Sequence, residues 1–328
     1  MLCSPLHVPL SAVAALLLGS GCGGAGATAR HSPAAASDTS SRPAPIALRL
    51  SGTTRLPAAV QLPAVAPAAR GVVVLGGLSA SDTSVANTLF IGPSGAREGK
   101  PLPVAVHDAA AANVDGHVYL FGGGTGSSAS KVILRVARGS SSVAGQLPVG
   151  ASDVAAATIG HTAYIVGGYT ETIPLATIVA FTPGSATHVV GLLPRPLRYA
   201  AVAAVGGRLL IAGGTSGVTA QRAILSYDPA TRAVRGIGEL PYPVTHAAGA
   251  SLNGYFYVLG GRSASLTGQR ASILAVDPST GNARSAGRLP EALSDLGSAS
   301  FSGRILLVGG RDSSGIVHDQ ALTLVPSR

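Results

Sequence analysis

The chain has 328 residues, of which 46% are hydrophobic and 11% are charged, so it can build a packed core and is not mainly disordered. Its 44 Gly and 22 Pro disfavour long helices and favour many short strands joined by turns. The net charge of +9 is carried by basic residues, mostly arginines, spread singly between Arg30 and Arg328, and this pattern does not indicate a nucleic-acid surface.

The first expected element is a secretory leader over residues 1–22. Its apolar stretch, residues 5–18, is shorter than the roughly 20 residues of a membrane-spanning helix and has the length of a signal-peptide core. The small residues before Cys22 resemble the bacterial lipobox, which implies lipidation at Cys22; ordinary secretory cleavage nearby and a buried apolar segment are the alternatives. Residues 23–45, rich in Ala, Ser and Pro, are expected to form a flexible tether. We therefore expect an extracytoplasmic protein, anchored to the membrane through a lipid or secreted.

Glycine doublets define a repeat in the rest of the chain. Each doublet ends a short apolar run, and the six begin at Gly76, Gly122, Gly167, Gly213, Gly260 and Gly309. A Leu-Pro pair precedes every doublet, with its proline 19 residues before the first glycine in all six cases. Unrelated loops would not keep this spacing, so the chain contains six copies of one unit.

Each unit is predicted to contain four short strands. Small residues follow the Leu-Pro pair, and a tight turn such as Asp115-Gly116 leads to the apolar strand that ends at the doublet. A polar loop, a third strand such as Ser272–Val276, a turn such as Asp277-Pro278 and a fourth strand complete the unit. Six such units over residues 46–328 predict an all-β, six-bladed β-propeller, since small side chains suit the strands that crowd the central axis.

The two ends of this region are expected to close the ring. After the last doublet only one strand remains, Ala321–Val325, and one strand-like run, residues 46–54, precedes the first Leu-Pro pair. We predict that this N-terminal run supplies the fourth strand of the last blade, because an open ring would leave sheet edges exposed to aggregation.

These repeats resemble the Kelch family of β-propellers over residues 46–328. The resemblance rests on the six doublets, on the tyrosine three places before the doublet at Tyr119, Tyr164 and Tyr257, and on the Asp228-Pro229 turn after Tyr227. The tryptophan that the family carries after this turn is absent, because the chain contains no Trp. The resemblance therefore implies that aliphatic side chains replace an aromatic contact between neighbouring blades.

A mostly polar column is the candidate site. The residues five places after each proline begin the innermost strands and are expected to ring the mouth of the central channel. They are Leu62, Asp108, Asp153, Tyr199, His246 and Asp295. The basic and aromatic residues expected on the same face are His107, Tyr169, Arg195, Arg198, Arg262 and Arg311. The alternative is that the column side chains bond to loop backbone, cap the strand starts and bind nothing.

Two functions of different classes fit this arrangement. The favoured one is a non-enzymatic binding module that presents its Leu-Pro and post-doublet loops to a protein or a cell-envelope glycan. The alternative is a sugar-acting enzyme in the channel mouth, which follows from a resemblance to six-bladed Kelch proteins that interconvert sialic-acid anomers. In that case Arg198, Arg262 or Arg311 would hold the sugar carboxylate by bidentate bonds.

No cofactor and no metal are expected. The sequence contains no serine-hydrolase elbow, zinc-protease helix motif or phosphate-binding loop. Cleavage at Cys22 would leave no other cysteine for a disulfide or a metal, and the column acids come from different blades. We expect a monomer that meets the membrane only through its lipid and does not bind nucleic acid.

Overall fold

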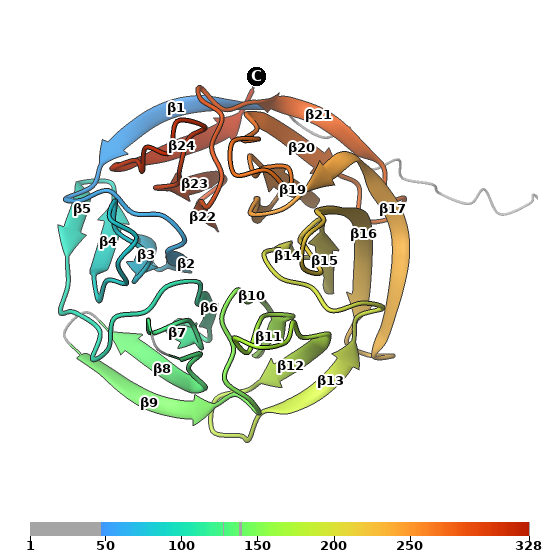
Figure 1. Cartoon of the computed structure of the whole chain (residues 1–328), viewed down its shortest axis with the longest axis horizontal. Helices are drawn as coiled ribbons and strands as arrows, with labels where there is room; N and C mark the ends of the chain where they lie inside the picture. The colour runs from blue at the N-terminus through green and yellow to red at the C-terminus, as the bar shows by residue number, and fades with distance from the viewer. Residues whose placement is uncertain (1–46, 127, 138–139, 328) are drawn as a thin grey trace, which may run out of the picture. The chain divides into compact units, whose positions relative to one another are not determined.

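The computed structural model describes residues 47–126, 128–137 and 140–327, and this part of the chain forms 24 strands and no helix. The strands make six four-stranded antiparallel sheets arranged around a central channel (Figure 1). This confirms the predicted all-β, six-bladed propeller. Among the described residues no helix could span a membrane.

The strands are named in chain order, from the channel outwards in each blade. Blade one contains β2 (Ala64–Ala68), β3 (Gly71–Leu75), β4 (Thr88–Gly92) and β5 (Gly95–Glu98). Blade two contains β6 (Ala110–Val114), β7 (His117–Phe121), β8 (Val132–Ala137) and β9 (Ser140–Gln146). Blade three contains β10 (Ala155–Ile159), β11 (Thr162–Val166), β12 (Thr177–Phe181) and β13 (His188–Leu192).

The remaining blades follow the same plan, except that the last one uses both ends of the region. Blade four contains β14 (Ala201–Val205), β15 (Arg208–Ala212), β16 (Gln221–Asp228) and β17 (Ala233–Val244). Blade five contains β18 (Ala248–Leu252), β19 (Tyr255–Leu259), β20 (Ser272–Val276) and β21 (Ala283–Arg288). Blade six contains β22 (Gly297–Phe301), β23 (Arg304–Val308), β24 (Gln320–Pro326) and β1 (Leu48–Arg55).

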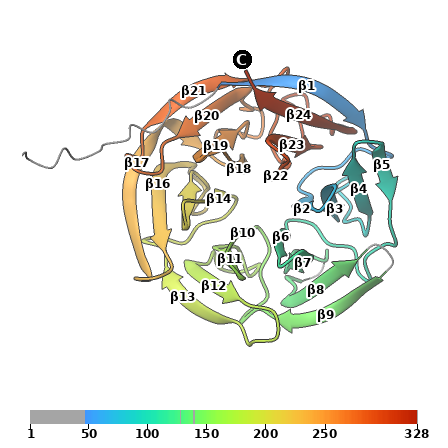
Figure 2. The ribbon, with the colours of Figure 1, turned by 180° about the vertical axis from the view of Figure 1, so that it is seen from behind.

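The N-terminal strand closes the ring as predicted. Strand β1 pairs antiparallel with β24, from Leu48 opposite Pro326 to Arg55 opposite Gln320, and both views show it along the outer edge of the last blade (Figures 1 and 2). Blade six therefore has a full set of four strands, and the edge of β24 is covered.

The glycine doublets join neighbouring blades. The second glycine donates its N–H to a carbonyl in the next Leu-Pro loop, as in Gly123 to Ala151 at 2.8 Å and Gly310 to Val60 at 2.9 Å. A Cβ on the preceding glycine would overlap the same oxygen, and Gly122 and Gly309 have left-handed φ values of 63° and 64°. The bond from Gly310 to Val60 links blade six to blade one.

Small residues allow the inner strands to approach one another. A Cβ on Gly249 of β18 would overlap the backbone of Val202 in β14, the inner strand of the preceding blade. Larger side chains pack further out, where each hydrophobic cluster joins two adjacent blades, as when Val74 and Ile91 of blade one meet Val308 of blade six. The core is thus a ring of interfaces between blades.

Aromatic contacts do link some blades, so the expected replacement by aliphatic side chains is wrong there. Phe181 of β12 contacts Tyr119 in blade two with ring centroids 5.0 Å apart, and Phe121 at 5.4 Å. Tyr227 of β16 lies 5.8 Å from Tyr164 in blade three. The aromatic residue stands at the end of the third strand, before the turn, and reaches the neighbouring blade without a tryptophan beyond it.

The loops divide between two faces of the propeller. The Leu-Pro and post-doublet loops share one face, here called the mouth face, and the tight turns within each blade lie on the far face. Asp115 and Gly116 have φ values of 52° and 81°, as the predicted type I′ turn requires. The leader over residues 1–22, with its lipidation site Cys22, and the tether over residues 23–45 lie outside the described residues.

Candidate functional site

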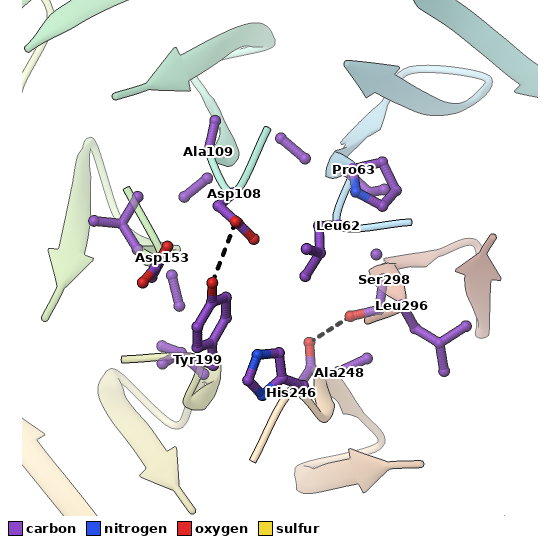
Figure 3. A pocket seen from close by; sticks show the side chains of 18 of the residues that line it. Leu62, Pro63, Asp108, Ala109, Asp153, Tyr199, His246, Ala248, Leu296 and Ser298 are labelled. Atoms are coloured by element: carbon purple, nitrogen blue, oxygen red, sulfur yellow. Dashed lines mark hydrogen bonds between the residues drawn. The ribbon is translucent and has the colours of Figure 1, made fainter. Parts of the chain in front are cut away.

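The six column residues lie together at the channel mouth, where the sequence predicted them. Figure 3 labels Leu62, Asp108, Asp153, Tyr199 and His246 around it. With the first residues of the inner strands they line a cavity of about 140 Å³. All six have a left-handed φ between 51° and 62°, which is uncommon for residues other than glycine. They are Leu62, Asp108, Asp153, Tyr199, His246 and Asp295.

A ring of backbone hydrogen bonds explains this conformation. The N–H of a column residue points sideways and donates to the carbonyl of the column residue in the preceding blade. The bonds are Leu62 to Asp295 at 2.7 Å, Asp108 to Leu62 at 3.4 Å, Tyr199 to Asp153 at 3.3 Å, His246 to Tyr199 at 3.2 Å and Asp295 to His246 at 3.1 Å. Such strained residues persist only where the surrounding structure holds them, and they cluster at functional sites.

Asp153 forms a buried ion pair with Arg198. The guanidinium Nε donates to Asp153 Oδ2, and the two side chains are 23% and 3% exposed for arginine and aspartate. The guanidinium also lies 3.9 Å from the ring centroid of Tyr169, so one arginine is held by a carboxylate and an aromatic face. Because Arg198 precedes the column residue of the next blade, this contact joins blades three and four.

Asp108 has a different environment from Asp153. Its Oδ2 accepts a hydrogen bond from the Tyr199 hydroxyl at 3.2 Å. Burial raises the pKa of the Asp108 carboxyl well above its ordinary value of 3.8, and the charges of Asp153 and Asp295 raise it further. Asp108 therefore keeps its proton more readily than an exposed aspartate.

His246 is held as a neutral imidazole. It stacks on Tyr199 with ring centroids 3.7 Å apart, its Nε2 lies 3.1 Å from the Arg262 guanidinium, and its Nδ1 lies 3.0 Å from Thr245 Oγ1. Since arginine can only donate, Nε2 accepts and Nδ1 carries the proton that is donated to Thr245. Burial lowers the pKa of His246 well below its ordinary 6.5, and the charges of Arg262 and Arg198 lower it further.

Two more buried groups complete the mouth. Asp295 accepts a hydrogen bond from Ser294, and burial raises the pKa of its carboxyl. His107 lies 2.8 Å from Ser84 through Nδ1 and 3.8 Å from Asp108 through Nε2, and burial lowers its pKa. The mouth therefore holds acids and imidazoles whose charged forms are disfavoured.

Not every predicted residue takes part in this cluster. Arg311 lies on the mouth face, but it forms an ion pair with Asp82, at 3.6 Å, rather than with a column residue. Arg195 lines a separate cavity of about 330 Å³ beside blade four. In the described part of the chain, the column carboxyls hydrogen-bond to other side chains, and no three column donors lie close enough to share a metal ion.

Sequence reasoning missed Thr245 and Ser294, which stand one place before column residues. Each forms a backbone bridge with the residue two places after the first glycine of a doublet, Thr245 with Arg262 and Ser294 with Arg311. This second fixed spacing was available in the sequence and would have marked both hydroxyl groups as neighbours of the column.

The comparisons with known proteins support the fold alone. No family model and no curated protein matches this sequence. Among solved structures, this chain is similar to YjhT, with a TM-score of 0.71 over 83% of this chain and 96% of the YjhT chain. The two sequences are 15% identical, so the likeness shows the fold alone.

Proposed function

We propose that this protein is a Kelch-type propeller that binds a small, hydroxyl-rich ligand in the mouth of its central channel, either a free sugar or the terminal sugar of a cell-envelope glycan. The observation that carries this proposal is the cavity in which Asp108, Asp153, Tyr199 and His246 converge. Side chains that bond one another across blades, as Arg198 does with Asp153 and Tyr199 with Asp108, are not independent caps of separate strands.

The size of the cavity favours one six-membered ring. Its volume of about 140 Å³ is close to that of engineered cavities of roughly 150 Å³ that hold benzene. The walls here are polar at the mouth and small further down, where Ala110, Ala156 and Ser298 line the channel. A pyranose ring has this size and carries the polar groups that such walls can satisfy.

The chemistry of the lining favours hydroxyl groups. Asp153 presents a carboxylate held by Arg198, which accepts hydrogen bonds, while the Asp108 carboxyl can donate as well as accept when protonated. Hydroxyl groups both donate and accept, so a sugar can bond to either acid without bringing a further charge into a buried site.

A second candidate function is acid–base interconversion of sugar anomers at the same site, favoured by the contrast between Asp108 and Asp153. The Asp153 carboxylate would take the proton of the anomeric hydroxyl while Asp108 gives its proton to the ring oxygen. The ring C–O bond then breaks, and reclosure on the other face returns both protons. Two acids whose environments differ in this way suit the two roles.

Binding measurements with isosteric variants test the proposal. A glycan array with the full chain selects the probe, and calorimetry then compares wild type with D108N, Y199F and H246Q, with D115N on the far face as the matched control. We expect each mouth variant to lose affinity about tenfold or more, as for loss of a buried hydrogen bond. Unchanged affinity in all three mouth variants would refute the site.

Catalysis is tested separately from binding. A freshly dissolved pure anomer is followed by NMR with wild type and D108N. Faster equilibration of the two anomers with wild type than with D108N would support the enzymatic function. If wild type bound the sugar tightly but did not accelerate equilibration of the anomers, the protein would be a binding module without this activity.

The proposed location is extracytoplasmic, with a lipid at Cys22 and residues 23–45 as the tether. Metabolic labelling with a fatty acid, lost in C22A, is the expected result; labelling that persists in C22A would exclude this anchor.

A further inference from the structure

Three metal-ligating side chains meet in blade six, away from the channel mouth cluster. Glu291 lies in the Leu-Pro loop before β22, and Asp312 and His318 lie in the loop between β23 and β24. His318 Nε2 is 3.2 Å from Asp312 Oδ2 and 3.6 Å from Glu291 Oε2. The three ligand atoms lie within 4.8 Å of one another.

The two better-buried members of this triad are held in place by other groups. Asp312 Oδ1 accepts the backbone N–H groups of Ser314 at 2.8 Å and Ile316 at 3.0 Å, which leaves Oδ2 directed at His318. His318 Nδ1 lies 3.4 Å from the side-chain amide nitrogen of Gln320; with a metal on Nε2 the proton lies on Nδ1, so the Gln320 amide must turn its oxygen to the ring to accept it. The backbone contacts of Asp312 fix the orientation of that ligand.

The charges of the triad are unbalanced. In the described part of the chain, Glu291 and Asp312 have no Arg or Lys within ion-pair distance, and His318 is the partner of both. This contrasts with Asp153 at the mouth, which is paired with Arg198, and it occurs in a chain with a net charge of +9. Two carboxylates beside one imidazole favour a divalent cation.

We infer that Glu291, Asp312 and His318 form a binding site for a divalent transition-metal ion, with Zn²⁺ as its best-fitting occupant. Ligand atoms at about 2.0–2.1 Å from a tetrahedral Zn²⁺ are roughly 3.3 Å apart, and the two separations from His318 Nε2, 3.2 and 3.6 Å, lie on either side of that value. The imidazole ligand disfavours Ca²⁺ and Mg²⁺, which prefer oxygen. Three protein ligands leave a fourth position for water.

The ion would stabilise the part of blade six where the ring closes. The carbonyl of His318 accepts the N–H of Val60 in the first Leu-Pro loop at 3.2 Å, and the next carbonyl, of Asp319, accepts the N–H of Leu56 at 2.7 Å. A metal that fixes His318 therefore also fixes the segment that follows β1. Binding to the folded state alone raises the melting temperature in proportion to the logarithm of metal concentration.

Zinc titration of the full chain, without an affinity tag and after chelator treatment, tests this site. Calorimetry and thermal melting compare wild type with H318Q and D312N. The matched control is H161Q, which alters an exposed histidine paired at 2.7 Å with the single carboxylate of Asp115. Far-ultraviolet circular dichroism confirms that each variant keeps its strands.

We expect wild type and H161Q to bind one Zn²⁺ per chain with a rise in melting temperature, and H318Q and D312N to bind at least about tenfold more weakly. Ca²⁺ and Mg²⁺ should not compete. Absence of saturable Zn²⁺ binding by wild type, or equal affinity in H318Q and D312N, would overturn the inference. Because neither residue lies at the channel mouth, these outcomes are independent of sugar binding.

Discussion

Two pairs of aspartate and histidine, one on each face, show how burial changes the same residue types. On the far face His161 and Asp115 are 2.7 Å apart, and their side chains are 84% and 47% exposed. At the mouth His246 and Asp295 are further apart, at 3.8 Å, and each is 8% exposed. At the mouth the pKa of His246 is lowered and that of Asp295 is raised, with burial as the first cause of both shifts. Burial rather than closeness therefore distinguishes a candidate site from a surface ion pair.

The largest effect is expected from opening the ring, which would separate blades at the mouth and leave the turns of the far face intact. Deletion of residues 46–57 removes β1 and the buried side chains of Leu48 and Leu56. Losing two buried leucines costs about 5 kcal/mol or more, which lowers the melting temperature by roughly 10 °C. Calorimetric melting measures this, and an unchanged melting temperature would refute closure by β1.

A smaller effect is expected from removing one arginine from each face. R198A leaves the Asp153 carboxylate buried and unpaired, which should cost about 3 kcal/mol. R208A breaks the pair between Arg208 and Asp228, 3.1 Å apart with side chains 53% and 24% exposed, and should cost less than about 1 kcal/mol. Urea denaturation measures both free energies of unfolding. Equal losses would show that the mouth is as well solvated as the far face.

The pH dependence of stability should reveal the protonated acid at the mouth. The pKa of Asp108 is raised in the folded state, so its favourable contribution is complete below its ordinary pKa of 3.8 and is lost as the pH rises through the folded pKa. D108N cannot ionise, so its stability relative to wild type should increase as the pH rises from about 4 to 8. D115N on the far face is the control. If the difference in stability between D108N and wild type did not change with pH, the Asp108 carboxyl would not have a raised pKa in the folded state.

The smallest pH effect is expected from the imidazole, with the opposite sign. The pKa of His246 is lowered in the folded state, so its contribution is complete above 6.5 and is lost as the pH falls through the folded pKa. H246Q should therefore lose part of the acid sensitivity of wild type between about pH 6.5 and 4. The measurement is the melting temperature of both proteins across that pH range. If the melting temperatures of wild type and H246Q changed in parallel with pH, the His246 imidazole would not be desolvated.

Much of the fold followed from the spacing of a few residues. The residue two places after the first glycine of each doublet bridges to the Leu-Pro loop of its own blade, as Thr245 does with Arg262, so the distance from the Leu-Pro pair to the doublet is constant along the chain. The aromatic contacts between blades were missed because only two of the six repeats carry an aromatic residue at this position, Phe181 and Tyr227. A residue that does not recur in the other repeats does not indicate which residue of the neighbouring blade it contacts. The placement of the column at the mouth was predicted, but its internal bonds were not.

The sequence by itself determined the number of blades, the closing strand and the ring on which Asp108, Asp153, Tyr199, His246 and Asp295 stand, because backbone pairing within each blade imposes a spacing that can be read directly. Only the tertiary structure decided that Arg198 meets Asp153, that Tyr199 meets Asp108 and that three ligand groups converge in blade six. Those contacts, and the pKa shifts that follow from burial, depend on how blades pack in space and on the water they exclude, which no spacing along the chain encodes.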